Sequence, residues 1–299
     1  MNVGATGARQ SGPVAPRRGG GHVDVAAAAK PRPRSEVLLR ALRPLIDALV
    51  GVLGRAGVDP HAIVLTHAAL GLVAALLVAL SPPSWTWAAV LLQLKMLLDN
   101  LDGGVARATG RVTRMGRYLD SVLDTVVNLL LFAALAVHGP MAWSWPMAAL
   151  AALVLMLMLS LDVNLEQRYK ALRGGAGEGG DEPIGAPLPL YRLVRGLYRL
   201  VLAPQDRWLT RADEALFQRL AGVPYAQAPL DVRLAWSDLF STATLVNLGL
   251  STQLLVLGLC LVLGVPFAYV WFVLAAGLYV LMVQILRVWR FRRYLGARP

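Results

Sequence analysis

Long apolar runs separated by short polar connections dominate the chain from residue 61 to residue 286. Six of these runs are candidate transmembrane helices, at 61–80, 85–98, 119–137, 145–161, 239–263 and 266–286. All but the second reach or approach the ~20 residues that cross roughly 30 Å of hydrocarbon. The second is short only because acidic residues begin in its last turns. Alternating strand patterns never exceed a few residues, so the pattern predicts an all-α integral membrane protein with six transmembrane helices.

The polar segments divide the rest of the chain. Residues 1–34 are rich in Gly, Ala, Pro and Arg without a periodic apolar face, which predicts a disordered basic arm. No apolar core follows its early basic residues, so it is not a signal peptide. Residues 35–57 carry apolar side chains at helical spacing among arginines, which predicts an amphipathic helix at the membrane interface. A short basic tail is expected at 291–299.

The internal segment 164–238 is too polar to cross a bilayer, and we expect it to form a cytoplasmic loop. Its glycine-rich run at 174–180 predicts a flexible linker. Two amphipathic helices are expected after the linker, at 190–202 and 207–220, with their arginines facing water. They would lie on the membrane surface or cover the entrance to a site.

Basic residues indicate the orientation of the chain. The short connections 81–84, 138–144 and 264–265 contain no Lys or Arg, whereas the other side of the predicted bundle holds nearly all of them. The positive-inside rule then places both termini in the cytoplasm. The net charge of +11 is explained by this topology and by attraction to anionic lipids. Nucleic-acid binding is not expected, because no aromatic-basic binding module is visible. The excess of arginine over lysine is typical of a high-GC bacterium, and it favours the inner membrane.

Four aspartates mark the candidate chemistry, because carboxylates are costly to place near hydrocarbon. Asp99 and Asp102 are three residues apart, and Asp120 and Asp124 are four apart. Each pair therefore occupies one face of its own helix, with Cβ atoms about 5–6 Å apart. Two such helices packed face to face would bring four carboxylates together on the cytoplasmic side. A divalent cation, Mg²⁺ or Mn²⁺, is the expected occupant.

The spacing around these residues is Asp99-x2-Asp102-Gly103-x2-Ala106-Arg107-x8-Gly116-x3-Asp120-x3-Asp124. It resembles the signature of the CDP-alcohol phosphotransferases at every fixed position, and the six-span plan extends the resemblance to a domain of residues 58–290. The resemblance implies that Asp99, Asp102, Asp120 and Asp124 bind the metal, and that Asp124 is also the catalytic base. The alternative for Asp124 is metal binding alone. It also implies that the CDP moiety is contacted at Gly103, Ala106, Arg107, Thr113 and Gly116. Gly103 and Gly116 could instead serve close helix packing. A homodimer is a further expectation from the family.

The acceptor depends on residues outside the signature. No Lys or Arg lies between Arg233 and Arg287, which argues against a phosphorylated acceptor unless Arg111, Arg114 or Arg117 provides the contact. We therefore expect metal-dependent phosphatidyl transfer from CDP-diacylglycerol to a small alcohol, with release of CMP. The alternative within the class transfers a phospho-alcohol from its CDP form to diacylglycerol. Outside the class, a cation- or proton-coupled carrier is disfavoured by the absence of paired repeats.

Several further polar residues lie in or beside the apolar runs. Lys95 precedes Asp99 by one helical turn, so a pair between them is expected; snorkelling to the surface and acceptor contact are the alternatives. His61 and His67 are expected at a helix end or near lipid head groups, and Cys260 in packing. Two residues could line an acceptor pocket, Asp162 and Asn164. Three others could join helices: Asn128, Asn247 and Gln253.

Overall fold

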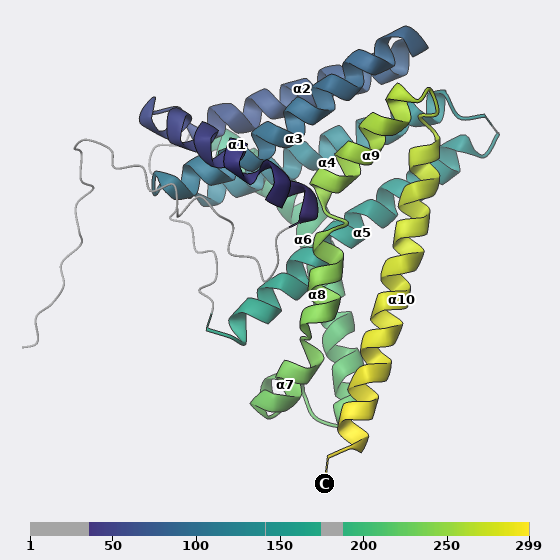
Figure 1. The fold of residues 1–299 in the computed structure, drawn as a ribbon. Coiled ribbons are helices and arrows are strands. Elements are labelled where there is room, and N and C mark those ends of the chain that lie inside the picture. The colour runs from purple at the N-terminus through teal and green to yellow at the C-terminus, as the bar shows by residue number, and fades with distance from the viewer. Residues whose placement is uncertain (1–35, 141, 175–187, 299) are drawn as a thin grey trace, which may run out of the picture.

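The computed structural model describes residues 36–140, 142–174 and 188–298, and Figure 1 shows their arrangement. The predicted disordered arm and nearly all of the glycine-rich linker lie outside these ranges. The α-helices are α1 (Val37–Arg55), α2 (Pro60–Leu80), α3 (Trp85–Ala108), α4 (Arg114–Val137), α5 (Ser144–Ala171), α6 (Leu188–Ala221), α7 (Leu230–Trp236), α8 (Leu239–Val246), α9 (Leu250–Val262) and α10 (Ala268–Gly296). Two short 3₁₀ turns, η2 (Pro82–Ser84) and η3 (Tyr225–Gln227), join helices. The described part of the chain contains no strand, so the all-α prediction is confirmed.

Five segments are long and apolar enough to cross a membrane: α2, α4, α5, the stretch from α7 to α9, and α10. The chain is therefore an integral membrane protein. Helix α3 has sufficient length, at 24 residues, but it carries charged side chains, among them Lys95 and Asp99. It packs along α2 on one side and α9 on another, which places it inside the helix bundle. A sixth span formed by α3 remains a prediction.

The turn between α3 and α4 folds the two halves of the aspartate signature against each other. Helix α3 ends at Ala108, and Gly110, two residues later, adopts φ +67°. The next amide, that of Arg111, donates to the Ala106 carbonyl at 2.8 Å. Glycine adopts this left-handed conformation without the steric penalty of a Cβ. Thr113 then caps α4, because its hydroxyl accepts the Gly116 amide proton at 3.0 Å. The short turn fixes how the carboxylates of α3 face those of α4.

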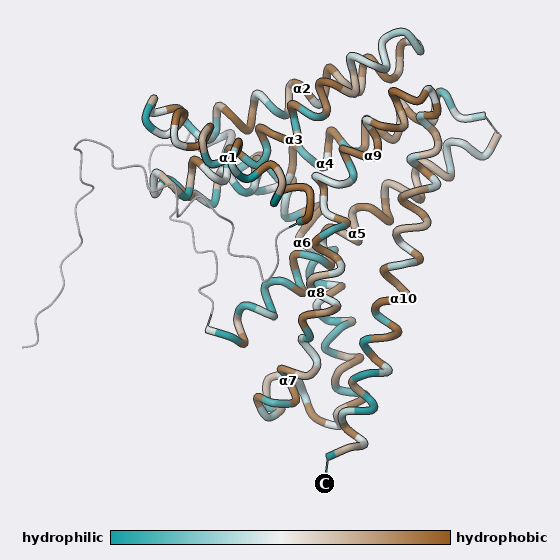
Figure 2. The backbone as a smooth tube through the Cα atoms, viewed as in Figure 1, coloured by the Kyte–Doolittle hydropathy of each residue, from teal (hydrophilic) through white to brown (hydrophobic). Residues whose placement is uncertain are grey.

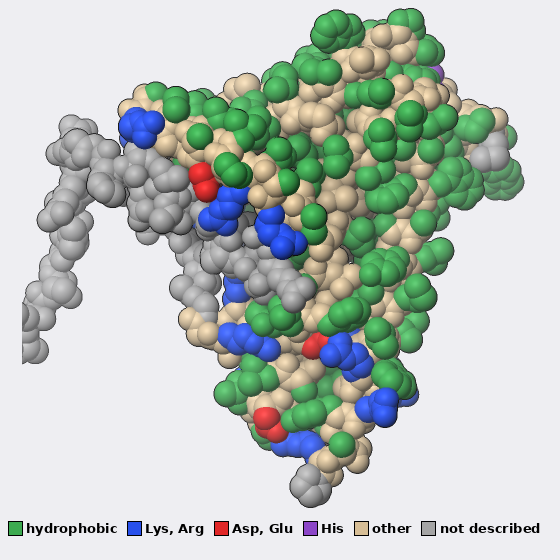
Figure 3. Space-filling view, in the orientation of Figure 1, with side chains coloured by type: hydrophobic (Ala, Val, Ile, Leu, Met, Phe, Trp, Pro, Cys, Tyr) green, Lys and Arg blue, Asp and Glu red, His purple; other side chains and the backbone are tan. Residues whose placement is uncertain are grey.

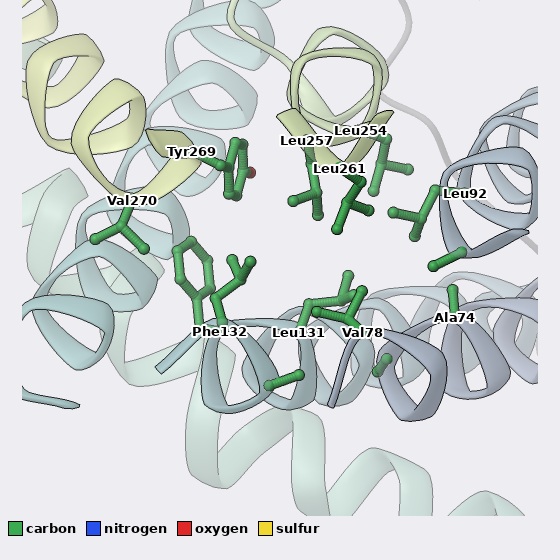
Figure 4. Packing of buried hydrophobic residues seen from close by; sticks show 14 of the residues in the cluster. Ala74, Val78, Leu92, Leu131, Phe132, Leu254, Leu257, Leu261, Tyr269 and Val270 are labelled. Atoms are coloured by element: carbon green, nitrogen blue, oxygen red, sulfur yellow. The ribbon is translucent and has the colours of Figure 1, made fainter. Parts of the chain in front are cut away.

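The main apolar core lies in the half of the bundle away from the aspartates. Figure 4 shows the side chains that α2, α3, α4, α9 and α10 contribute to it. Phe132 of α4 stacks on Tyr269 of α10, with ring centroids 5.6 Å apart. The Tyr269 hydroxyl donates to Gln253 of α9 at 3.1 Å, so Gln253 joins helices as expected. Dense packing of this half holds the helices whose other ends carry the carboxylates.

The span predicted at 239–263 overlaps the candidate span Leu230–Val262, but it is divided into two helices, α8 and α9. The helix breaks at residues 247–249, and Gly249 has an extended backbone, with ψ 174°. The Asn247 side chain accepts the Val37 amide proton at 3.1 Å, which caps the start of α1. A Cβ on Gly249 would lie 2.7 Å from Glu36 Oε1. The start of α1 therefore packs against this break. The contact joins residues far apart in the sequence, so the apolar run alone does not predict it.

Helix α6 is one helix, not the predicted two, and it continues through Pro204. Polar contacts tie it to α5 after this proline. Thr210 donates to Asn164 at 2.8 Å, Arg168 pairs with Asp213 at 2.6 Å, and Ser160 donates to Asp206. These contacts lie one helical turn apart along α5, and they hold α6 against α5 just after the position where proline removes a backbone hydrogen bond. Asn164 thus joins α5 to α6.

Figure 2 colours most of α10 as hydrophobic, with hydrophilic residues toward its C-terminal end. In Figure 3 hydrophobic side chains cover the outer face of the molecule along α10, and Leu278 of this helix is 69% and Met282 63% exposed. Such apolar exposure is expected on a face that contacts lipid. Lys and Arg side chains gather over α1 and around α7 and the C-terminal end of α10. That end continues to Gly296, so most of the predicted tail is helical. Arg287 of α10, ahead of this tail, is buried and pairs with Asp213 at 2.8 Å.

Candidate metal centre and substrate cavity

The four signature aspartates meet at one place, around the side chain of His67. His67 lies on α2 with none of its surface exposed. Its Nε2 is 3.1 Å from Asp102 Oδ2, 3.5 Å from Asp120 Oδ1 and 4.0 Å from Asp99 Oδ1, and its Nδ1 is 4.0 Å from Asp124 Oδ1. The convergence of the two aspartate pairs, expected from their spacing, is therefore observed. The head-group or helix-end position expected for His67 is wrong.

Lys95 pairs with Asp124, not with Asp99 as expected. Its side chain is fully buried, and Nζ donates to Asp124 Oδ1 at 2.6 Å. The pair joins α3 to α4 across the bundle. Lys95 and Asp124 face each other between the two helices, and both Asp99 and Asp124 line the cavity. The ammonium offsets one of the four negative charges, and it holds the Asp124 carboxylate in place.

The donor set suits a divalent cation. Ligand atoms of His67, Asp99, Asp102 and Asp120 all lie within 4.8 Å of one another. Two buried atoms in this group, His67 Nδ1 and Asp120 Oδ1, have no hydrogen-bond partner. Buried polar atoms are rarely left unpaired, and a cation would satisfy the carboxylate oxygen. The residues therefore fit the metal that the sequence predicts, and Asp124 as a further ligand stays a prediction.

A cavity of about 930 Å³ opens beside the carboxylates. All five residues expected to contact a CDP moiety line it: Gly103, Ala106, Arg107, Thr113 and Gly116. A Cβ on Gly103 would meet the Arg107 guanidinium at 3.0 Å, so this glycine leaves room for Arg107, not for a neighbouring helix. A Cβ on Gly116 would meet Thr113 Oγ1 at 3.3 Å. The two glycines thus shape the cavity wall, while their contact with CDP remains a prediction.

His61 has the helix-end role that was expected for it. Its Nδ1 lies 3.0 Å from Asp59, the N-cap of α2, and its Nε2 lies 3.2 Å from the Thr113 hydroxyl. It therefore links the start of α2 to the start of α4 at the cavity rim.

Helices α1, α5 and α6 supply further walls of the cavity. Arg40 and Arg43 of α1 line the cavity from one side, and Tyr198 and Asp206 of α6 from another. The Tyr198 hydroxyl donates to Asp206 at 3.4 Å. Burial raises the pKa of Tyr198, and the nearby Asp206 carboxylate raises it further. Tyr198 therefore stays a hydrogen-bond donor at neutral pH. Asp162 also lines the cavity, as expected, whereas Asn164 does not.

Comparison with known proteins agrees with this geometry. Residues 60–213 match the CDP-alcohol phosphatidyltransferase family. A phosphatidylinositol phosphate synthase of Streptomyces avermitilis is 30% identical over 208 residues, which are 70% of this chain and 76% of that protein. The chain belongs to the CDP-alcohol phosphatidyltransferase family. Membership confirms the resemblance carried by the aspartate signature.

Other relatives match shorter parts of the chain. A bifunctional IPC transferase and DIPP synthase of Aquifex aeolicus is 40% identical over 101 residues, 34% of this chain but only 22% of that protein. An archaetidylinositol phosphate synthase of Aeropyrum pernix is 42% identical over 62 residues, 19% of this chain and 32% of that protein. The family and these relatives make the chain a membrane transferase of phospholipid biosynthesis.

Two features of this CDP-alcohol phosphatidyltransferase family member were not predicted from the sequence: the position of His67 among the aspartates, and the pairing of Lys95 with Asp124. A signal for His67 was present, because a polar ring inside an apolar run carries the same kind of cost that singled out the aspartates. No feature of the local sequence indicated whether Lys95 pairs with Asp99 or with Asp124. It depends on the rotation of α3 against α4, which only packing decides.

Proposed function

We propose that this protein transfers a phosphatidyl group from CDP-diacylglycerol to a phosphorylated inositol, in a metal-dependent reaction that releases CMP. The observation that carries the proposal is the meeting of the signature carboxylates and arginines around one cavity. The donor follows from the family, and the acceptor from the relatives, which include synthases of phosphatidylinositol phosphate and archaetidylinositol phosphate.

A phosphorylated acceptor differs from the expectation that the sequence favoured. That expectation rested on the lack of basic residues along α8, α9 and most of α10. Arginines nevertheless line the cavity from elsewhere, including Arg40 and Arg43 of α1 and Arg111 in the turn after α3. Their guanidinium groups suit phosphate oxygens. These arginines support a negatively charged acceptor, because their positive charge would offset the negative charge of a phosphate on the acceptor.

In the proposed mechanism an acceptor hydroxyl oxygen attacks the phosphorus that carries diacylglycerol. A new P–O bond forms to the acceptor, the P–O bond to CMP breaks, and CMP leaves with the bonding electrons. Asp124 takes the hydroxyl proton, with its carboxylate oriented by Lys95. Arg107 binds phosphate oxygens of the donor. His67, Asp99, Asp102 and Asp120 would hold a divalent ion, which would supply positive charge to neutralise the phosphates.

The site is proposed to face the cytoplasm of a bacterial inner membrane, where the soluble acceptor is available. The basic ends of α7 and α10, and the arginines of α1, support this orientation by the positive-inside rule. Pairing into a homodimer stays a prediction.

The test is CMP release by the purified protein in detergent with Mg²⁺ or Mn²⁺ and CDP-diacylglycerol. Acceptors are supplied one at a time: inositol 1-phosphate, inositol, glycerol 3-phosphate and serine. Release that requires inositol 1-phosphate and stops with a chelator supports the proposal. Release with unphosphorylated inositol alone, or with CDP-choline and diacylglycerol instead, would reject it.

A further inference from the structure

Helix α6 turns one largely polar face toward the substrate cavity. On this side the cavity is lined by Tyr198, Leu202, Gln205 and Asp206. The positions 198, 202, 205 and 206 recur at helical spacing and therefore share one side of α6. The Gln205 amide donates to the Met156 carbonyl at 2.7 Å, which fixes this face against α5. The face carries polar groups to which the proposed transfer reaction assigns no role.

Asp206 is the charged residue of this face, and two hydroxyl groups orient its carboxylate. Ser160 of α5 donates to Oδ1, and Tyr198 donates to Oδ2 at 3.4 Å. In the part of the chain that the structure describes, no Lys or Arg forms an ion pair with Asp206. An ionised carboxylate accepts hydrogen bonds at about four positions. Asp206 therefore has acceptor positions left for a molecule in the cavity.

Two tyrosine rings border the same part of the cavity. Tyr118 of α4 packs on Tyr198 of α6, with ring centroids 4.7 Å apart, and both residues line the cavity. Tyr118 precedes Asp120 by two residues, so the pair joins α6 to the turns of α4 that carry the carboxylates. Small-molecule sites typically combine aromatic surface with a few polar groups that fix the orientation of the ligand. The polar face of α6 has this composition.

The charge of Asp206 restricts what it can bind. A carboxylate repels a phosphate group, which the arginines of the cavity suit instead. An ammonium group would meet the charge of Arg117, which lies close enough to act on the Tyr198 hydroxyl. A neutral hydroxyl group meets neither conflict, and it forms a strong hydrogen bond when a carboxylate oxygen accepts its proton.

We infer that the Asp206 carboxylate binds hydroxyl groups of the acceptor, and that α6 thereby selects a polyol over simpler alcohols. The inference rests on the proposed function, in which the acceptor is a phosphorylated inositol. Ring hydroxyls donate to the open positions of the carboxylate while arginines hold the phosphate. Asp206 binds and orients the acceptor, and it takes no part in the bond exchange at phosphorus.

The alternative role for Asp206 is a structural tie between α6 and α5 through Ser160. Other contacts already join the two helices around this position: Gln205 with Met156, Thr210 with Asn164, and Asp213 with Arg168. A tie to Ser160 also engages only one oxygen of the carboxylate, whereas Tyr198 orients the other. A structural tie therefore does not account for the whole arrangement.

The experiment measures equilibrium binding to the purified full chain in detergent with Mg²⁺, by isothermal titration calorimetry. The probes are inositol 1-phosphate, its analogues that each lack one ring hydroxyl, serine and inorganic phosphate. Asp206→Asn should weaken binding of inositol 1-phosphate by at least about tenfold, the loss expected for a hydrogen bond to a charged group. Binding of inorganic phosphate should not change, because the arginines remain.

The deoxy analogues separate direct contact from a structural effect. At least one of them should bind the wild type at least about tenfold more weakly than inositol 1-phosphate does. For that analogue Asp206→Asn should add little further loss, because the hydroxyl that the carboxylate binds is already absent. A structural role of Asp206 would instead weaken the binding of all probes alike.

The matched control is Asp231→Asn, the same substitution at an exposed acid of α7, and it should leave the affinity for every probe unchanged. If Asp206→Asn does not fold, Tyr198→Phe carries the test, because it keeps the aromatic ring and removes one hydroxyl that orients the carboxylate. It should weaken binding of inositol 1-phosphate about threefold, as for a neutral hydrogen bond, and leave inorganic phosphate unaffected.

Three results would overturn the inference. The first is equal loss for all probes in Asp206→Asn, which assigns Asp206 to structure. The second is binding of inositol 1-phosphate that does not depend on Asp206 or Tyr198, or that is absent from the wild type. The third is binding of serine that Asp206→Asn abolishes, which assigns the carboxylate to an ammonium group.

Failure of this inference can be told apart from failure of the proposed function. CMP release that requires inositol 1-phosphate, with an unchanged KM in Asp206→Asn, rejects the role of Asp206 alone. Binding of inositol 1-phosphate that depends on Asp206, without CMP release, rejects the proposed reaction and leaves the polyol site standing.

Discussion

At the scale of single residues, the centre concentrates charge where water is scarce. Lys95 and His67 have no exposed surface, and Asp102 is nearly buried. Isolated buried charges are strongly unfavourable, so each must be compensated by a partner. The Lys95 ammonium compensates the charge of Asp124. The other three carboxylates lie around one polar group, the His67 ring. The residual negative charge is the physical reason to expect a cation.

Replacing one carboxylate of the proposed metal centre by its amide should abolish turnover and leave the fold intact. For Asp99→Asn, Asp102→Asn and Asp120→Asn, we expect CMP release to fall more than about 100-fold, since loss of a ligand exceeds the effect of losing a supporting residue. Thermal unfolding in detergent should change little. Asp231→Asn, an exposed acid of α7, is the control and should keep full activity. Retained turnover in any of the three would remove that residue from the site.

Lys95→Met tests the buried ion pair. It leaves Asp124 without its partner, and breaking a buried pair typically costs about 3–5 kcal/mol of stability. We expect a lower unfolding temperature in detergent and weak transfer activity. The double variant Lys95→Met/Asp124→Asn should regain stability relative to Lys95→Met, because no unpaired charge remains, but should stay inactive. A double variant less stable than Lys95→Met would show that the pair does not account for the loss.

At the scale of elements, small residues decide how closely the helices approach. Gly71 of α2 faces Val127 of α4 and Lys95 of α3, and Gly277 of α10 faces Val154 of α5. Close approach through small residues is a main source of helix association in membranes. The contact at Gly71 lies one turn from His67, so it sets both packing and site geometry.

Gly71→Ala should therefore lower activity and stability together. The added Cβ would lie 2.6 Å from Val127 Cγ1, which forces α2 and α4 apart. Gly196→Ala in α6 is the matched control, because nothing lies within 4 Å of its added Cβ. The control should be neutral or slightly stabilising, since alanine favours helix by about 1 kcal/mol over glycine. Thermal unfolding and CMP release measure both effects, and equal behaviour of the two variants would contradict the packing role of Gly71.

At the scale of the whole molecule, one end of the bundle is basic and the other is not. The connection between α4 and α5 lies at the end without Lys or Arg among its described residues, and α10 ends among arginines. This asymmetry predicts that the two ends lie on opposite sides of the membrane.

Thiol labelling in intact cells tests this orientation. With the natural thiol removed by Cys260→Ser, Trp143→Cys should react with a membrane-impermeant reagent added outside. Ala297→Cys should react only after permeabilisation. Both positions are exposed, so accessibility and not burial decides the result. The reverse pattern would place the metal centre outside the cytoplasm.

The sequence by itself determined the helical class, most of the spans, the convergence of the four carboxylates and the reaction family. These features are local: apolar runs of membrane length, and carboxylates three or four residues apart on one helix face. Helix geometry converts such spacings directly into neighbours. The break at Gly249 and the continuity of α6 through Pro204 were not predictable in this way, because contacts with α1 and α5 stabilise them.

Only the tertiary structure decided that His67 joins the aspartates, that Lys95 selects Asp124, and that arginines of α1 reach the cavity. Each of these depends on the rotation and depth of one helix relative to another. Those quantities follow from the packing of many small side chains along whole helices, such as Gly71 against Val127. No spacing within one segment encodes them.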